Sequence, residues 1–260
     1  MKVKEIVEFL KSLAVYPVVS DTVDTIKYGS ENEEVFKIGV TLFPHYNVIK
    51  EAKDNGVNLL ICHEPLFYRD DERPLPYGFI REKEMLIKNS GMTIFRFHDH
   101  AHCMSPDLIF NGQMNALGLK GEYVKGKYFG VNRFILQKSI TTIELAKMIE
   151  RKWKIKHVRI AGSRDNIIKT ISCGFGSTFY KKEELIECDT FLCGECCEWS
   201  DAEFVRDFSL IERNKSIIVL GHSNSEEAGM KLLTKILKDN FPCVETEYFA
   251  SGDVFSYTNG

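Results

Sequence analysis

Histidine and carboxylate residues gather directly after three short apolar runs of this sequence. Five of the seven histidines fall in these clusters. The clusters are His63-Glu64, His98-Asp99-His100-Ala101-His102, and His222 with Glu226. Imidazole nitrogens and carboxylate oxygens suit zinc, manganese and iron(II). These residue types therefore predict a site for one or two divalent metal ions, and a carboxylate that bridges two ions would suit hydrolytic chemistry.

The apolar runs before the clusters have the length of strands, and they alternate with segments of helical periodicity. Strands that alternate with helices indicate an α/β fold with mainly parallel strands. In such sheets ligands bind at the carboxyl ends of the strands, so three clusters that are distant in sequence are expected to converge.

Nine segments are predicted as strands and six as helices. The predicted strands are Phe36–Leu42, Val57–Cys62, Met92–Phe97, Phe129–Gln137, His157–Ala161, Thr170–Phe175, Thr190–Cys193, Ser216–Leu220 and Val244–Phe249. The predicted helices are Val3–Leu13, Tyr46–Asn55, Phe79–Asn89, Thr142–Trp153, Asp201–Ile211 and Glu226–Lys238. Glycines cluster between Lys120 and Lys127, which predicts a boundary between a first half, 1–124, and a second half, 125–260.

Each cluster also has a purely structural interpretation. His63 could simply end a strand, and His98 and His100 could be half-buried and hydrogen-bonded. Ser223-Asn224-Ser225-Glu226 matches a capping box, which gives Glu226 a structural role at a helix start. His98 and His102 are four residues apart and would share one face of a helical turn or of an extended strand. The concentration of histidines favours metal binding over these alternatives.

Composition limits the classes of function. A formal net charge of -3 gives no basic excess for a nucleic-acid surface. No apolar run reaches the ~18 residues of a membrane span, and the N-terminal segment lacks the continuous apolar stretch of a signal peptide. We therefore expect a cytoplasmic protein that binds neither membrane nor nucleic acid. The eight cysteines are expected to be reduced, and the cluster of Cys193, Cys196 and Cys197 favours a structural or incidental role over redox chemistry or metal binding.

Four segments resemble the Nif-three-like family of dinuclear-metal proteins (NGG-one-interacting factor three-like), some members of which carry the name GTP cyclohydrolase I type 2. The segments are LLICHEPLFY at 59–68, FRFHDHAH at 95–102, DTFLCGECCEW at 189–199 and GHSNSEEAGMKLL at 221–233. The resemblance implies two similar, intertwined α/β halves with mixed, mainly parallel sheets. It also implies a homohexameric ring, the compact form without an inserted domain, and two divalent ions per chain, either zinc, iron or manganese.

The resemblance also implies which residues bind metal. The family's paired histidines fall on His63 and Glu64, its histidine–aspartate pair falls on His98 and His102, and its final pair falls on His222 and Glu226. Relative to the family pattern, one histidine has become Glu64 and one aspartate has become His102. We interpret this as an exchange of roles that keeps the donor set, with Asp99 as the rival carboxylate.

Further residues are expected around the ligands. Whichever of Asp99 and His98 does not bind metal is the candidate for proton transfer. Glu195 could orient a ligand or contact a substrate, or it could sit in a tight turn. We expect His100, like Glu195, to orient a metal ligand or to contact the substrate.

Two functions remain open. The first is a metal-dependent hydrolase that acts on a nucleotide-like or other small substrate, although no glycine-rich phosphate loop supports nucleotide binding. The alternative is a non-catalytic regulatory or protein-interaction module whose ions are structural. An open coordination position on the metal would distinguish the enzyme from the module. A third function, nucleic-acid binding by a ring-shaped oligomer, has only the implied ring shape in its favour, and the net negative charge counts against it.

Overall fold

The nine strands and six helices predicted from the sequence are all present in the computed structural model, which describes residues 1–212 and 214–258. The structure is an α/β fold with two sheets, as expected. The chain divides into two compact units. The first comprises Met1–Leu108 with Gly229–Gly252, and the second comprises Ile109–Ala228 with the described part of Asp253–Gly260.

The first unit contains a five-stranded sheet in the order β1-β4-β3-β2-β11. Its strands are β1 (Ile26–Tyr28), β2 (Lys37–Thr41), β3 (Leu59–Cys62), β4 (Thr93–Arg96) and β11 (Glu245–Tyr248). All neighbouring pairs are parallel except β1 with β4. Every residue of β3 and β4 is buried, which explains the continuous apolar sequence of β3.

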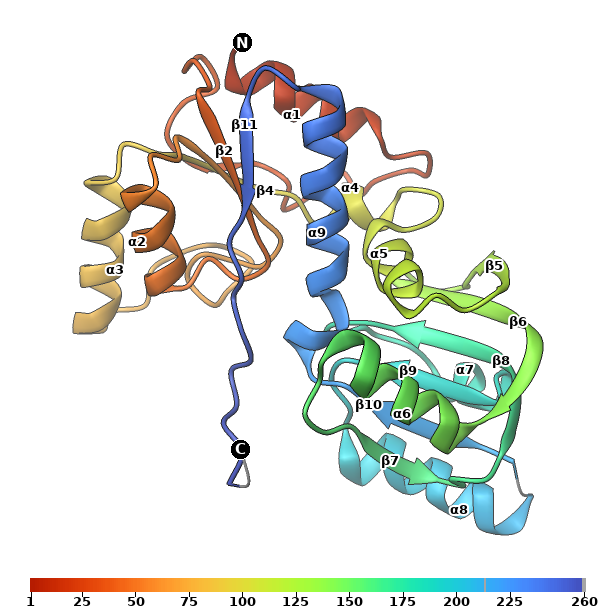
Figure 1. Ribbon diagram of the computed structural model, residues 1–260. Coiled ribbons are helices and arrows are strands. Elements are labelled where there is room, and N and C mark those ends of the chain that lie inside the picture. Colours follow the sequence, from red (N-terminus) through yellow and green to blue (C-terminus); the bar gives the residue numbers. More distant parts are fainter. Residues whose placement is uncertain (213, 259–260) are drawn as a thin grey trace. The chain divides into compact units, whose positions relative to one another are not determined.

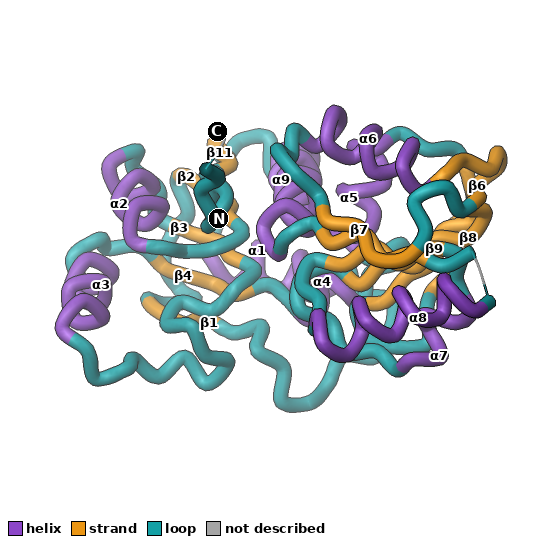
Figure 2. The backbone as a smooth tube through the Cα atoms, turned by 90° about the horizontal axis from the view of Figure 1, so that it is seen from below, coloured by secondary structure: helices purple, strands orange, loops and turns teal. Residues whose placement is uncertain are grey.

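Two helices pack side by side on one face of this sheet, α2 (Tyr46–Asp54) and α3 (Gly78–Lys88) (Figures 1 and 2). Their buried faces share one core cluster with the sheet. That cluster includes Val48, Ile49, Ile80, Ile87, Leu60 and Ile94. Burial of each such aliphatic side chain stabilises the unit by about 1.5–3 kcal/mol. The unit also contains α1 (Val3–Ser12) and the short helix α4 (Asp99–His102).

The second unit contains a six-stranded sheet in the order β5-β6-β8-β9-β10-β7. Its strands are β5 (Gly121–Lys125), β6 (Val131–Thr141), β7 (Arg159–Gly162), β8 (Ile167–Gly174), β9 (Thr190–Cys193) and β10 (Ser216–Val219). The central strands β8, β9 and β10 are parallel, and the remaining pairs are antiparallel. Both β9 and β10 are entirely buried, so this parallel centre is the core of the unit.

The helix α6 (Thr142–Trp153) of the second unit begins with a clear local signal, and the next two helices are held by tertiary contacts. The helix α6 starts with a capping box in which Thr141 and Glu144 satisfy each other's backbone N–H groups. The helix α7 (Lys182–Glu187) carries Glu184, whose buried carboxylate accepts two hydrogen bonds from Arg133, at 2.7 and 2.8 Å, and one from Ser172 at 2.5 Å. A π-helical turn at Glu198–Ala202 leads into α8 (Glu203–Ile211), which packs on β7 and β10.

Several elements were not predicted. They are β1, β5, α4, α5 (Leu108–Leu117), α7 and the π-helical turn. Most are short or polar, and β5 is largely exposed, so no apolar run marks them.

The predicted start of the last helix is wrong. The sequence predicts Glu226–Lys238, but α9 covers His222–Asn240, so Ser223 of the capping-box pattern lies inside the helix. The reason is Gly221, whose φ of +87° turns the chain sharply and lets the helix start one residue later.

The two compact units are discontinuous in sequence, and neither coincides with a single stretch before or after residue 124. The strand β5 spans the predicted boundary and belongs to the second unit. The similarity of two halves stays a prediction. Within the described residues, none of the helices combines the length and the apolar character that crossing a membrane requires. All eight cysteines carry free thiols, as expected.

Candidate metal centre

The ends of β3 and β4 bring the first two histidine clusters together. The two strands are parallel neighbours, with Cys62 opposite Arg96, so the residues that follow them leave the sheet side by side. Phe97 donates its backbone N–H to the Cys62 carbonyl at 2.8 Å, which extends the ladder by one step. The ring of His63 then donates from Nδ1 to the Phe97 carbonyl at 2.9 Å, and Arg96 Nε donates to the His63 carbonyl at 3.0 Å. Both strand ends are therefore fixed around His63.

A buried carboxylate organises the second cluster. Asp24, which is fully buried, accepts hydrogen bonds from the backbone N–H groups of His98 at 2.7 Å, Asp99 at 3.0 Å and His100 at 2.8 Å. It therefore caps α4 from a loop far away in the sequence. His100 also donates from Nδ1 to Asp24 at 2.7 Å. Sequence reasoning missed Asp24, because one acidic residue in a loop carries no signal.

Three imidazoles converge in the first unit. The ring centroid of His63 lies 4.5 Å from that of His98 and 5.2 Å from that of His102. The centroids of His98 and His102 lie 5.0 Å apart. One nitrogen of each ring lies within 4.8 Å of the corresponding nitrogens of the other two. Among the described residues of this unit, His63, His98 and His102 form the group of donors that could hold a metal ion.

Each of the three rings is oriented through its Nδ1 atom. His63 donates to the Phe97 carbonyl at 2.9 Å. His98 donates to Asp99 Oδ1 at 2.9 Å, and His102 donates to Asp107 Oδ2 at 2.8 Å. Nδ1–H donation to an oxygen fixes the tautomer and presents Nε2 to a metal. This donor set fits a divalent transition metal such as zinc or iron(II). Sequence reasoning also missed Asp107, which is buried and follows His102 by five residues.

The electrostatics of the three rings favour the unprotonated ligand form at His63. Its pKa lies well below the ordinary histidine value, first because the ring is buried and then because His98 and His102 are close. A neutral ring keeps the lone pair that a metal needs.

The carboxylate of Asp99 is held by hydrogen bonds from one of the three rings, His98, and from the loop before β1. It accepts hydrogen bonds from Thr22 Oγ1 at 2.7 Å, from the Val23 backbone at 3.1 Å and from His98. Burial alone would raise the pKa of Asp99, but the hydrogen bonds from His98 and Thr22 outweigh it and hold the pKa far below the usual range. Asp99 is therefore an ionised partner of His98.

Glu64 follows His63 and is half-buried. Its backbone N–H donates to the Leu42 carbonyl at 3.0 Å. One oxygen of its carboxylate lies within 4.8 Å of a ring nitrogen of His63, close enough for the two side chains to share an ion, and its predicted role as a metal ligand stays a prediction.

The third cluster lies in the second unit. His222 and Glu226 occupy neighbouring turns of α9, with His222 Nε2 and Glu226 Oε2 3.1 Å apart. Nδ1 of His222 donates to Glu195 Oε1 at 2.6 Å, the kind of contact that orients a ligand. Gly176 has a φ of +64°, and a Cβ there would lie 2.2 Å from the Glu226 carboxylate, so only glycine lets the loop approach this pair.

The fold and these side chains define an α/β protein with a histidine-rich candidate metal centre. The family model described as Duf34/NIF3 (NGG1p interacting factor 3) matches residues 1–252, and the chain belongs to this family.

Curated relatives and solved structures agree with this assignment. The chain is 24% identical over 87% of its length to a GTP cyclohydrolase 1 type 2 homolog of Clostridium perfringens, of which it covers 87%. It is 25% identical over 92% of its length to a homolog of the same name from Methanocaldococcus jannaschii, covering 96% of that protein. In fold it is similar to Staphylococcus aureus protein SA1388, with a TM-score of 0.78, 18% identity and 99% coverage of both chains. It is also similar to reduced HcgD from Methanocaldococcus jannaschii, with a TM-score of 0.76, 20% identity, and coverage of 95% of this chain and 97% of that one.

The low pKa of His63 has a direct experimental consequence. In metal-free protein its ring resonances should remain those of neutral imidazole as the pH falls through about 6.5, the ordinary histidine value. Below that pH the unfolded chain binds a proton that the folded chain does not, so this residue lowers the stability of the fold as the pH falls. An NMR titration of the ring measures the pKa, and a midpoint at or above about 6.5 would show that burial does not keep the ring neutral.

Proposed function

We propose that this chain is a divalent-metal-binding protein and that His63, His98 and His102 bind one ion through Nε2. One observation carries the proposal, namely the convergence of three imidazoles whose Nδ1 atoms are each held by an oxygen acceptor. Imidazoles that merely fill a core do not need three such aligned anchors. Asp99 and Asp107 orient the rings and raise their basicity toward a metal.

Glu64 is our candidate for the carboxylate ligand that accompanies these rings. Its rival, Asp99, already accepts hydrogen bonds from Thr22, Val23 and His98. The exchange of a histidine for Glu64 and of an aspartate for His102 keeps the number of nitrogen and oxygen donors in the family's set.

In the second unit we propose that His222 and Glu226 are ligands of a second ion. Glu195 would then orient His222, because its carboxylate accepts the Nδ1 proton of that ring. The metals we expect are zinc, iron or manganese, since the donors are imidazoles and carboxylates.

The activity we propose is metal-dependent hydrolysis of a nucleotide-like or other small substrate. Support comes from the donor set and from the relatives named GTP cyclohydrolase 1 type 2 homolog. A bound divalent metal supplies Lewis-acid activation of water and of the substrate. The residues of the chain would hold the ions, fix the imidazole tautomers and move a proton. With His98 proposed as a ligand, Asp99 is the candidate for that proton transfer.

The alternative is a non-catalytic role in regulation or protein interaction, as the family description, NGG1p interacting factor 3, indicates for the protein that gave the family its name. A coordination position closed by protein ligands would favour that role, whereas an exchangeable water would favour hydrolysis.

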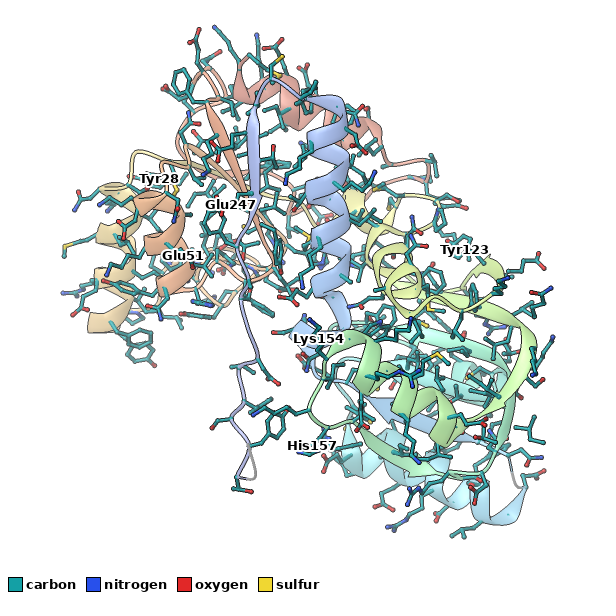
Figure 3. The ribbon with its side chains drawn as sticks, in the orientation of Figure 1. Tyr28, Glu51, Tyr123, Lys154, His157 and Glu247 are labelled. Atoms are coloured by element: carbon teal, nitrogen blue, oxygen red, sulfur yellow. The ribbon has the colours of Figure 1, made fainter. Side chains whose placement is uncertain are left out.

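Metal content tests the central proposal. Protein reconstituted with zinc should retain one to two ions per chain, and His63→Ala and His102→Ala should each lower zinc affinity by at least about tenfold, because each removes a ligand. His157→Ala is the matched control, since His157 is exposed and precedes β7 in the second unit (Figure 3). His222→Ala should remove the second ion.

Elemental analysis after gel filtration gives the ion count, and competition with a chelator gives the affinity. Fewer than ~0.2 ions per wild-type chain after reconstitution with zinc, manganese or iron would sink the proposal. Circular dichroism of each variant confirms that the fold is retained.

The role of Glu64 is tested by Glu64→Gln. The substitution keeps the size of the side chain but removes its charge, so metal affinity should fall by about tenfold or more. The matched control is Asp54→Asn at the end of α2, an exposed position remote from the three histidines in sequence. If Glu64→Gln binds metal as tightly as the wild type, Glu64 is not a ligand and the exchange of roles is wrong.

We also propose that the chain forms a homo-oligomer, a hexamer by its family resemblance. Light scattering of purified protein at micromolar concentration should give a mass above that of a dimer. A monomer's mass of 29.9 kDa would rule the assembly out.

A further inference from the structure

A cavity in the second unit exposes two thiols that the proposed metal chemistry does not use. Its volume is 360 Å³, and its walls include Phe179, Tyr180, Asp201, Cys196 and Cys197. This size lies within the range of small-molecule sites, which is roughly 300–1,000 Å³. The wall combines aromatic surface with sulfur atoms, and Cys196 contributes to it while remaining half-buried.

A second cysteine lies behind this wall. Cys193 is the last residue of β9 and is completely buried, and it precedes Cys196 by three residues. The two residues thus form a Cys-x-x-Cys pair with one sulfur in the core and the other on the cavity. A resolving thiol that is shielded from solvent and a nucleophilic thiol that is accessible form the arrangement that thiol–disulfide exchange requires.

The backbone between the two cysteines is fixed. Gly194 donates its N–H to the Gly174 carbonyl at 3.3 Å, and Glu195 donates to the Gly176 carbonyl at 2.9 Å. A Cβ on Gly194 would lie 2.5 Å from Ser225 Oγ, so the loop also packs closely against α9. These contacts restrict the backbone conformation of the loop that joins the two cysteines.

The two thiols differ in acidity because they interact. A hydrogen bond from Cys193 lowers the pKa of Cys196, and the same interaction, followed by burial, raises the pKa of Cys193. Elsewhere burial raises the pKa of Cys62 and of Cys188 to about 12, and these thiols stay protonated. The thiol on the cavity is thus the one prepared to act as a nucleophile.

Metal binding does not account for the pair. Among the described residues, no third histidine, cysteine or carboxylate completes a metal-binding group with Cys193 and Cys196. Two donors alone do not make a structural zinc site, which takes four.

We propose that Cys193 and Cys196 form a thiol–disulfide exchange site whose substrate is a small-molecule disulfide bound in the adjoining cavity. Cys196 is the attacking residue and Cys193 is the resolving residue. Neither thiol is among the proposed metal ligands, although Glu195 of the cavity wall accepts a hydrogen bond from His222. The proposal therefore does not depend on the proposed metal binding.

The chemistry balances with a disulfide RSSR as the oxidant. The Cys196 thiolate attacks one sulfur of RSSR, a Cys196–SR bond forms, and the first RS⁻ leaves and takes a proton from water. Cys193 then attacks the Cys196 sulfur, and its proton passes to the second departing RS⁻. Two protein thiols are oxidised to a disulfide, and one disulfide is reduced to two thiols.

The test uses the full chain, reduced and then exposed to glutathione disulfide at neutral pH. The reaction is quenched with acid, and intact mass and free thiols are measured with time. The wild type should lose two thiols and two hydrogens and should carry no glutathione at this site, and dithiothreitol should reverse the change. Cys193→Ser should instead stop at a mixed disulfide, with one glutathione on Cys196.

Two variants identify the attacking thiol. Cys197→Ser is the matched control, because it removes the adjacent exposed thiol, and it should behave as the wild type does. Cys196→Ser should form no internal disulfide. Cys196 should also react about tenfold faster than the exposed Cys243, since the hydrogen bond from Cys193 lowers the pKa of Cys196 and favours its thiolate. An internal disulfide that persists in Cys196→Ser, or a Cys196 that reacts no faster than Cys243, would overturn the proposal.

Discussion

The parallel pairing of β3 with β4 is the constraint on which the candidate metal centre depends. It sets Cys62 opposite Arg96, so His63 and His98 leave the sheet within ring contact of each other. The bond from His63 Nδ1 to the Phe97 carbonyl continues the ladder with a side chain where the backbone ladder ends. A slip of one residue in this register would send the rings to opposite faces of the sheet, because successive side chains of a strand alternate.

The second requirement is a buried negative charge that is fully satisfied. A helix of four residues, such as α4, has no stability of its own, because the conformational entropy lost in forming the first turn exceeds the free energy that its hydrogen bond contributes. Asp24 supplies the missing stability by accepting three backbone N–H groups and the His100 ring. His102 thereby lies one turn beyond His98, with its backbone N–H 3.2 Å from the His98 carbonyl. The position of His102 thus rests on an aspartate that is distant in sequence.

Sequence patterns anticipated the architecture better than the contacts that hold the rings. Buried parallel strands such as β9 and β10 are continuous apolar runs, and these can be recognised without a structure. The convergence of His63 with His98 and His102 follows from the rule that sites form at strand ends. Asp24 and Asp107 could not be predicted, since a lone carboxylate acquires its partner only through tertiary structure. The start of α9 was misjudged because a serine-rich segment imitates a cap, while Ser225 actually bonds back to the His222 carbonyl at 2.7 Å.

The edge strand β11 has a consequence for the order in which the chain can fold during synthesis. It pairs with β2 (Figure 1), and Ser251 beyond it accepts a hydrogen bond from the backbone N–H of Phe43, 208 residues earlier in the chain. While a ribosome is still making the intervening residues, one edge of β2 remains unpaired, and open strand edges are templates for association with other chains. The first unit begins to emerge before the second, yet it stays incomplete until residues 245–248 arrive, after most of the second unit has been made. Until then this edge of β2 must be kept from pairing with another chain.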